Sequence, residues 1–311
     1  MSQVPYTKPP LSINDQLDLL TSRGLRIDNQ TQARHLLRSI GYYRLSGYWY
    51  PLLSEPKSAH TFKPEASFEK AFIMYCFDYK LRSLLLDQLS KIEVHTKAKL
   101  GNTYSMHHGP FWVENVDLFR RRDRHDRIIE TIKTEYDRSN AEFARSFRSN
   151  YSNPLPPSWM ILEFSSFGVV SRIISNLVSS IQLKSLSRGM GLNEEYFKSW
   201  MHALVYLRNL CAHHSRCWNN EMQVVPKIPR LINTRTGRPY PFPSNPWINT
   251  SSLSNRRCYY FICVIKYFLD IVHTSNLLKD QLTELFDSYP SIDIEKSLDF
   301  PNDWEGQPLW Q

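Results

Sequence analysis

Long apolar stretches are missing from this sequence. No window of its 311 residues approaches the ~18 consecutive apolar residues that a transmembrane helix needs. The first eight residues, Met1 to Lys8, also lack the apolar segment of a secretion signal. We therefore expect a protein that stays out of the membrane and acts in the cytoplasm.

Cysteine is scarce, and the number and spacing of the cysteines argue against disulfide bonds and against a metal site. The five cysteines are an odd number, and none of their spacings matches a metal site. Three of them lie on apolar helical faces, which is typical of reduced core residues in a cytoplasmic protein. Carboxylates and histidines do not cluster at metal-ligand spacing either. We expect no metal and no other cofactor.

Signals for β-strands are also few, and apolar residues recur mainly at helical spacing. A hydrophobic content of 41% with 13% aromatic residues supports a substantial core. The sequence therefore predicts a mainly α protein. We expect an up-and-down bundle built from helices over residues 67–100, 158–179 and 193–214, with additional N- and C-terminal helices.

Three parts are expected along the chain. Residues 1–66 form a helical and aromatic segment that packs on the core, and residues 67–220 form the helical core. Residues 221–311 hold a proline-rich loop, C-terminal helices and an acidic tail, which we expect to be loosely held. The aromatic segment 41–50 is interpreted as a core-packing helix, with a base-stacking surface as the alternative.

Acidic residues are outnumbered by basic ones, and the excess of positive charge is unevenly distributed along the chain. The formal charge is +8, and the last 22 residues carry five acidic residues against one lysine, so residues 1–289 carry +12. A basic body indicates a polyanionic partner, above all a nucleic acid. The densest basic run is 120–127, where we expect Arg121, Arg122 and Arg124 to contact RNA phosphates, unless the run is a solvated face.

The most informative stretch ends a predicted helix that starts at Asn193. One stripe of that helix is apolar: Phe197, Trp200, Met201, Leu204, Leu207 and Cys211. Its polar end carries Arg208, Asn209, His213 and His214. At 100° per residue Asn209 and His213 lie 40° apart, and Arg208 is long enough to reach the same cleft. An arginine that holds a phosphate and a histidine that moves a proton suffice to cut RNA without a metal.

Structural explanations exist for the same residues. Arg208 is a favourable cation near a helix C-terminus, and His213 is a plausible cap. A polar strip on the helix from Ser67, made of Asp78, Arg82 and Glu93, either links helices by ion pairs or lines the cleft. Further candidates are Glu163 as a polar partner in the cleft and Arg216 as the holder of a second phosphate.

These residues carry a family resemblance. Arg208-x4-His213, or Arg208-x5-His214, resembles the Arg-x4-6-His signature of HEPN ribonucleases. Six wider motifs, spread over roughly residues 10–220, resemble the Abi family of abortive-infection proteins related to the AbiD and AbiF types. One departure is Lys97, where the family usually has arginine. The motifs are Tyr43-Arg44-Leu45-Ser46-Gly47-Tyr48, Phe77-Asp78-x-Lys80-Leu81-Arg82, Lys91-Ile92-Glu93, Pro156-Pro157-x-Trp159, Glu163-x-x-Ser166-Phe167-Gly168 and Arg208-Asn209-x-Cys211-Ala212-His213-His214-x-Arg216-x-Trp218-Asn219.

The resemblance implies a HEPN-like bundle that cleaves RNA by attack of the 2′-hydroxyl, as a toxin in phage defence. It also implies a homodimer and an antitoxin, either a protein or a small RNA, and the residues do not select between the two. Two other classes stay open. One is a non-catalytic RNA- or nucleotide-binding module of a defence or toxin-antitoxin system, and the other is a structural interaction protein.

Overall fold

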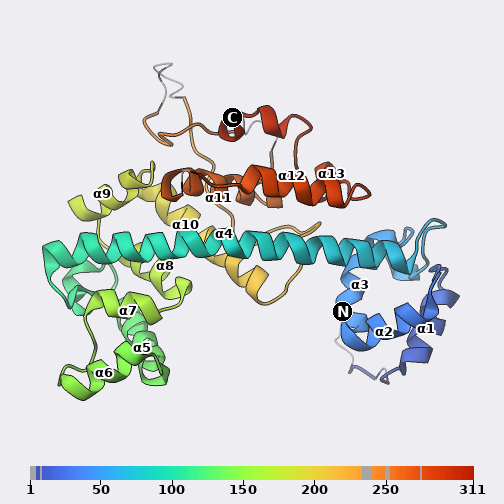
Figure 1. Ribbon diagram of the computed structural model, residues 1–311, viewed down its shortest axis with the longest axis horizontal. Coiled ribbons are helices and arrows are strands. Elements are labelled where there is room, and N and C mark those ends of the chain that lie inside the picture. Colours follow the sequence, from blue (N-terminus) through green and yellow to red (C-terminus); the bar gives the residue numbers. More distant parts are fainter. Residues whose placement is uncertain (1–4, 8, 233–237, 239, 249–252, 274) are drawn as a thin grey trace. The chain divides into compact units, whose positions relative to one another are not determined.

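The structure is a computed structural model that describes residues 5–7, 9–232, 238, 240–248, 253–273 and 275–311. Within these ranges the chain forms thirteen α-helices and six short 3₁₀ helices, with isolated β-bridges but no β-strand (Figure 1). The predicted mainly α class is therefore confirmed. No helix in the described ranges is both long and apolar enough to cross a membrane.

Contacts divide the chain into two compact units. The first consists of residues 1–81 with 287–292, and the second of residues 82–286 with 293–311. The longest helix, α4 (Phe68–His108), contributes to both. The expected three-part division at residues 66 and 220 stays a prediction.

The first unit begins with α1 (Ile13–Ser22), α2 (Gln30–Ser39) and α3 (Tyr42–Trp49). Ser12 caps α1 in a reciprocal capping box with Asp15. The 3₁₀ helices η1 (Tyr50–Leu52) and η2 (Lys57–Ala59) lead to α4. The polar N-cap residues Ser12 and Asn29 therefore mark where α1 and α2 start.

The aromatic segment forms α3, and one side of it packs into the core. Leu45, Tyr48 and Trp49 are buried, and the Tyr48 hydroxyl donates a 2.6 Å hydrogen bond to Asp78. Tyr43, by contrast, is 92% exposed. The core-packing interpretation therefore holds for three of these side chains, and Tyr43 faces solvent.

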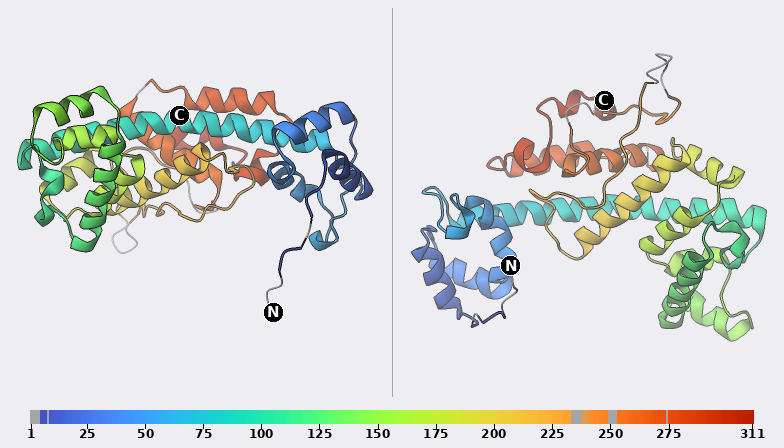
Figure 2. Two further views of the ribbon diagram at one scale, coloured as in Figure 1. Left: turned by 90° about the horizontal axis from the view of Figure 1, so that it is seen from below. Right: turned by 180° about the vertical axis from the view of Figure 1, so that it is seen from behind.

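The second unit holds the rest of α4 and most of the other helices. Its core centres on α8, which packs against α5 and α10, while α10 also packs against α9 and α11 (Figures 1 and 2). All six residues of the predicted apolar stripe on α10 are buried. The helices are α5 (Arg122–Arg138), α6 (Glu142–Asn150), α7 (Ser158–Phe164), α8 (Phe167–Asn176), α9 (Ile181–Gly189), α10 (Glu194–Ala212), α11 (Cys258–Val272), α12 (Leu278–Ser288) and α13 (Ile294–Leu298). The 3₁₀ helices are η3 (Trp112–Glu114), η4 (Val116–Leu118), η5 (Trp304–Gly306) and η6 (Pro308–Trp310).

Helix α4 runs past the expected end near Leu100. Gly101 lies inside it, and a Cβ added there would come within 3.4 Å of Leu162 on α7. The glycine therefore permits close packing of two helices and does not end α4. Residues 158–179 contain two helices, because the chain leaves α7 at Phe164 and Ser166 caps α8.

The acidic tail is packed and not loosely held, so that expectation was wrong. From Asp293 onward it forms α13, η5 and η6, and Phe300, Trp304 and Trp310 are buried. The rings of Phe300 and Tyr259 on α11 lie 4.6 Å apart, and the Trp310 indole N–H donates to the Tyr259 hydroxyl at 3.3 Å. Aromatic burial, more than the acidic charge, therefore holds the tail.

Candidate functional site

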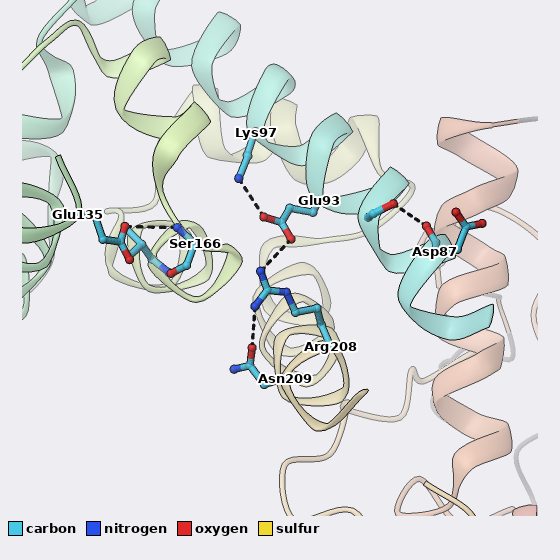
Figure 3. Close-up of polar contacts among 9 residues, drawn as sticks. Asp87, Glu93, Lys97, Glu135, Ser166, Arg208 and Asn209 are labelled. Carbon is cyan, nitrogen blue, oxygen red and sulfur yellow. Dashed lines mark hydrogen bonds and ion pairs between the residues drawn. The ribbon is translucent and has the colours of Figure 1, made fainter. Parts of the chain in front are cut away.

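A polar cluster joins α4 and α10 at the Arg-His motif. Arg208 Nη2 lies 3.6 Å from Glu93 Oε2, and Lys97 Nζ lies 2.9 Å from the other oxygen of the same carboxylate. Arg208 Nη1 donates a 3.1 Å hydrogen bond to Asn209 Oδ1 (Figure 3). Glu93 and Asn209 therefore hold the guanidinium of Arg208 from two sides, and Lys97 neutralises the other oxygen of Glu93.

The cluster has one positive charge in excess, because two cations share one carboxylate. The Glu93 and Lys97 side chains are only 14% and 12% exposed, whereas Arg208 keeps 29% of its side-chain surface exposed. A partly buried cation held by a carboxylate is pre-oriented, and its remaining N–H groups can bind an anion such as a phosphate. Lys97 occupies the position where arginine was expected and supplies its charge to Glu93.

The predicted polar strip splits in two. Glu93 joins Arg208, but Asp78 is buried and accepts the hydrogen bond of Tyr48 on α3. Arg82 is buried as well. Asp78 therefore supports the link between helices that was one of the two explanations, and Glu93 contacts Arg208 of the motif.

Glu163 was expected beside the cleft, yet its side chain on α7 is exposed. The carboxylate that contacts the start of α8 is instead Glu135 on α5, which accepts a 3.3 Å hydrogen bond from the backbone N–H of Ser166 (Figure 3). Helical spacing places Glu163 on the outer side of a short helix, since Ile161 and Leu162 take the buried side. Glu135 has no sequence signal beyond its charge.

Helix α10 ends at the two histidines in a Schellman motif. The N–H of Ser215 donates to the Leu210 carbonyl at 2.9 Å, and the N–H of His214 donates to the Cys211 carbonyl at 3.1 Å. His213 is the C-cap, and His214 has φ of +57°, the left-handed conformation that usually belongs to glycine. Both histidine side chains are exposed, so they are accessible to a ligand.

This geometry gives a test of His214. A left-handed non-glycine residue costs about 1–2 kcal/mol, and glycine removes that strain but adds about 0.4–1 kcal/mol of unfolded-state freedom. We expect His214→Gly to leave the free energy of unfolding within about 1 kcal/mol of the original while it removes the imidazole. Urea unfolding measures the stability. A loss of much more than about 1 kcal/mol would contradict the left-handed conformation described for His214.

The residues after the histidines are anchored in the core. Trp218 is 5% exposed, and the Sγ atoms of Cys211 and Cys217 lie 3.7 Å apart. Arg216 between them is half-buried, and its carbonyl accepts a hydrogen bond from Asn220 at 3.0 Å. The loop that carries Arg216 is therefore held at both ends.

The basic run 120–127 continues into α5, and the arginines of the run differ in their contacts. Arg121 is committed to Asp123, with two hydrogen bonds of 3.0 and 2.9 Å. This contact lowers the pKa of the Asp123 carboxyl. Arg122 and Arg124 are exposed at the start of α5. That all three arginines contact RNA stays a prediction. Because Arg121 is bound to Asp123, the exposed Arg124 is more accessible to a phosphate than Arg121 is.

One histidine near the cluster was missed. His95 lies between Glu93 and Lys97 in sequence, and burial, followed by the charge of Lys99, lowers its pKa. Its Nε2 atom is buried without a hydrogen-bond partner among the described residues. In the sequence His95 looks like any other histidine on a helix. Its burial in the structure is what distinguishes it from the exposed histidines. In the described ranges no three His, Cys, Asp or Glu side chains gather as metal ligands would.

Comparison with known proteins supports the motifs. A family model described as Abi-like protein matches residues 35–219, more than half of the chain, and this range contains the cluster and both histidines. Neither a curated protein nor a solved structure gives a match. On the strength of this match the chain belongs to the Abi-like protein family.

Proposed function

We propose that this protein is a metal-independent endoribonuclease of the HEPN type that acts as an abortive-infection toxin. One observation carries the proposal: Arg208 is held by Glu93 with part of its guanidinium exposed, and α10 ends at an exposed histidine five residues later. Five residues correspond to about 7.5 Å of helix rise, within the reach of an arginine side chain and one phosphodiester. Membership of the Abi-like family supports a role in abortive infection.

The proposed reaction is a transesterification. His213 accepts the proton of the 2′-hydroxyl, the 2′-oxygen attacks the adjacent phosphorus, and the bond from phosphorus to the 5′-oxygen breaks. The leaving oxygen takes a proton from a second acid, which leaves a 2′,3′-cyclic phosphate and a 5′-hydroxyl. Arg208 stabilises the charge on the pentacoordinate phosphate, and Asn209 holds Arg208 in position through their hydrogen bond.

The purified protein with total cellular RNA tests this proposal. We expect cleavage that persists in EDTA and fragments that carry 5′-hydroxyl and 2′,3′-cyclic phosphate ends, detected by end-labelling with and without prior phosphatase treatment. RNA binding without any cleavage would favour the alternative, a non-catalytic RNA- or nucleotide-binding module. Fragments with 5′-phosphate ends would contradict the proposed chemistry.

The reaction needs a base and an acid, and a homodimer would supply them. The Arg-x4-His spacing also occurs at Arg120 and His125, but His125 is buried, so each chain offers one exposed pair, Arg208 and His213. A two-fold axis near the end of α10 would bring two such histidines together. We expect twice the 36.7 kDa chain mass by light scattering at micromolar concentration. A monomeric mass with full cleavage would refute the dimer and would make His214 the candidate for the second group.

A further inference from the structure

A basic groove of about 500 Å³ lies between α5, α8 and α10 in the second unit. Arg124 and Arg127 line it from α5, Arg172 from α8 and His202 from α10. Hydroxyl groups from α5 and α8 complete the walls, and none of the described residues around it is acidic; the hydroxyl residues are Thr131, Ser171 and Ser175. The groove thus brings three arginines from α5 and α8 together with a histidine from α10.

Helix geometry explains why these side chains converge. Arg124, Arg127 and Thr131 recur at steps of three and four, so they share one side of α5. That side flanks Ile128, which is buried where α5 packs against α8. On α8 the neighbours of Arg172 at the groove are serines, and their small side chains leave the space open. The groove is therefore built by the core packing itself.

The charge of the groove is available to a ligand. Arg124, Arg127, Arg172 and His202 are all exposed, and within the described chain none of the three arginines forms an ion pair. Asp123 and Asp126 are the acidic neighbours of these arginines in sequence; neither lines the groove, and the Asp123 carboxylate is bound by Arg121. Three guanidinium groups without a carboxylate partner will attract an anion.

The chemistry of the walls selects phosphate. Guanidinium groups bind phosphate oxygens through paired hydrogen bonds, and serine and threonine hydroxyls add single donors. A volume of about 500 Å³ is in the range that holds a small ligand or a nucleotide. Ile128 is the one apolar side chain among the described residues that line the groove, so we expect the sugar-phosphate backbone and not the base to be recognised.

The position of His202 connects the groove to the candidate site. At 100° per residue, His202, Asn209 and His213 lie within 40° of one another around α10. The eleven residues from His202 to His213 rise about 16 Å, a distance that a few nucleotides of a single strand can span. One strand could therefore follow this side of α10 from the groove to the exposed histidine.

We propose that the groove binds backbone phosphates of the RNA a few nucleotides from the bond cleaved at His213. This inference rests on the proposed ribonuclease function, but it assigns a separate site with its own residues. Of the basic run, Arg124 and Arg127 belong to this site, and Arg172 of α8 and His202 of α10 are additions from two other helices.

The test compares two triple variants of the full-length protein. Arg124→Gln, Arg127→Gln and Arg172→Gln remove three charges from the groove. Arg138→Gln, Arg145→Gln and Arg188→Gln remove three from exposed positions outside its lining. Both are made in a His213→Ala background, so that RNA stays intact, and are titrated with a short fluorescein-labelled single-stranded RNA at several salt concentrations. Circular dichroism checks that both variants fold.

We expect the groove variant to bind at least about tenfold more weakly at low salt, with the slope of log affinity against log salt reduced by about 0.7 per lost phosphate contact. The control variant should keep most of the affinity and slope. Equal weakening by both variants, or unchanged affinity and slope in the groove variant, would overturn the inference.

Cleavage by the unsubstituted protein tests the ribonuclease proposal separately. If that protein cleaves RNA and the groove variant binds RNA as before, the groove inference alone fails. If no cleavage occurs but the groove variant binds selectively more weakly, the groove stands as an RNA site and the ribonuclease proposal fails.

Discussion

Substituting His213 or Arg208 by alanine is expected to abolish toxicity in bacteria and to reduce RNA cleavage by about 10²–10⁴-fold. His213 is exposed at the C-cap of α10, and Arg208 retains exposed surface beside Glu93. Neither substitution opens a cavity in the core. Loss of Arg208 leaves Glu93 paired with Lys97, so no carboxylate is stranded. Growth after induction, total RNA and cleavage rates of the purified proteins measure the effect.

Two variants make the result specific. His35→Ala removes an exposed histidine of the first unit and should keep full toxicity. Arg208→Lys retains the charge but loses the paired N–H groups, so it should recover only part of the activity. Full activity of His213→Ala together with inactivity of His214→Gly would show that the working spacing is Arg-x5-His.

Substituting Trp310 by alanine is expected to destabilise the second unit by about 3–5 kcal/mol. The indole is 2% exposed, donates to Tyr259 and lies edge-on to Trp304 with ring centroids 4.9 Å apart. Its removal leaves a cavity over α11 and takes the indole donor away from the Tyr259 hydroxyl. For a unit of this size the melting temperature should fall by about 10 °C.

Trp159→Ala is the matched control, because Trp159 lies in the same unit but is 48% exposed. It should cost about 1 kcal/mol or less. Equal destabilisation by both substitutions, measured by thermal and urea unfolding, would contradict the packing described for the tail. A stable Trp310→Ala variant would restore the view of the tail as a loosely held acidic segment.

Local signals set most of the helices of this protein. Ser12, Asn29, Ser166, Ser180 and Asn193 each cap the helix that follows, because a short polar side chain satisfies a free backbone N–H. The apolar stripe of α10 and its end at the two histidines also follow from residues within a few positions of one another. Such features depend on short-range geometry, which the order of residues specifies directly.

Only the tertiary structure decided which polar groups meet. Glu93 and Arg208 are over a hundred residues apart, and the two helical faces that they occupy allow many partners, so charge and spacing could not distinguish Glu93 from Asp78. The groove likewise needs α5, α8 and α10 packed together before Arg124, Arg172 and His202 become neighbours. The tail shows the same limit: its acidic residues suggested a charge contact, but its aromatic rings found apolar partners on α11, and burial outweighs screened surface charge.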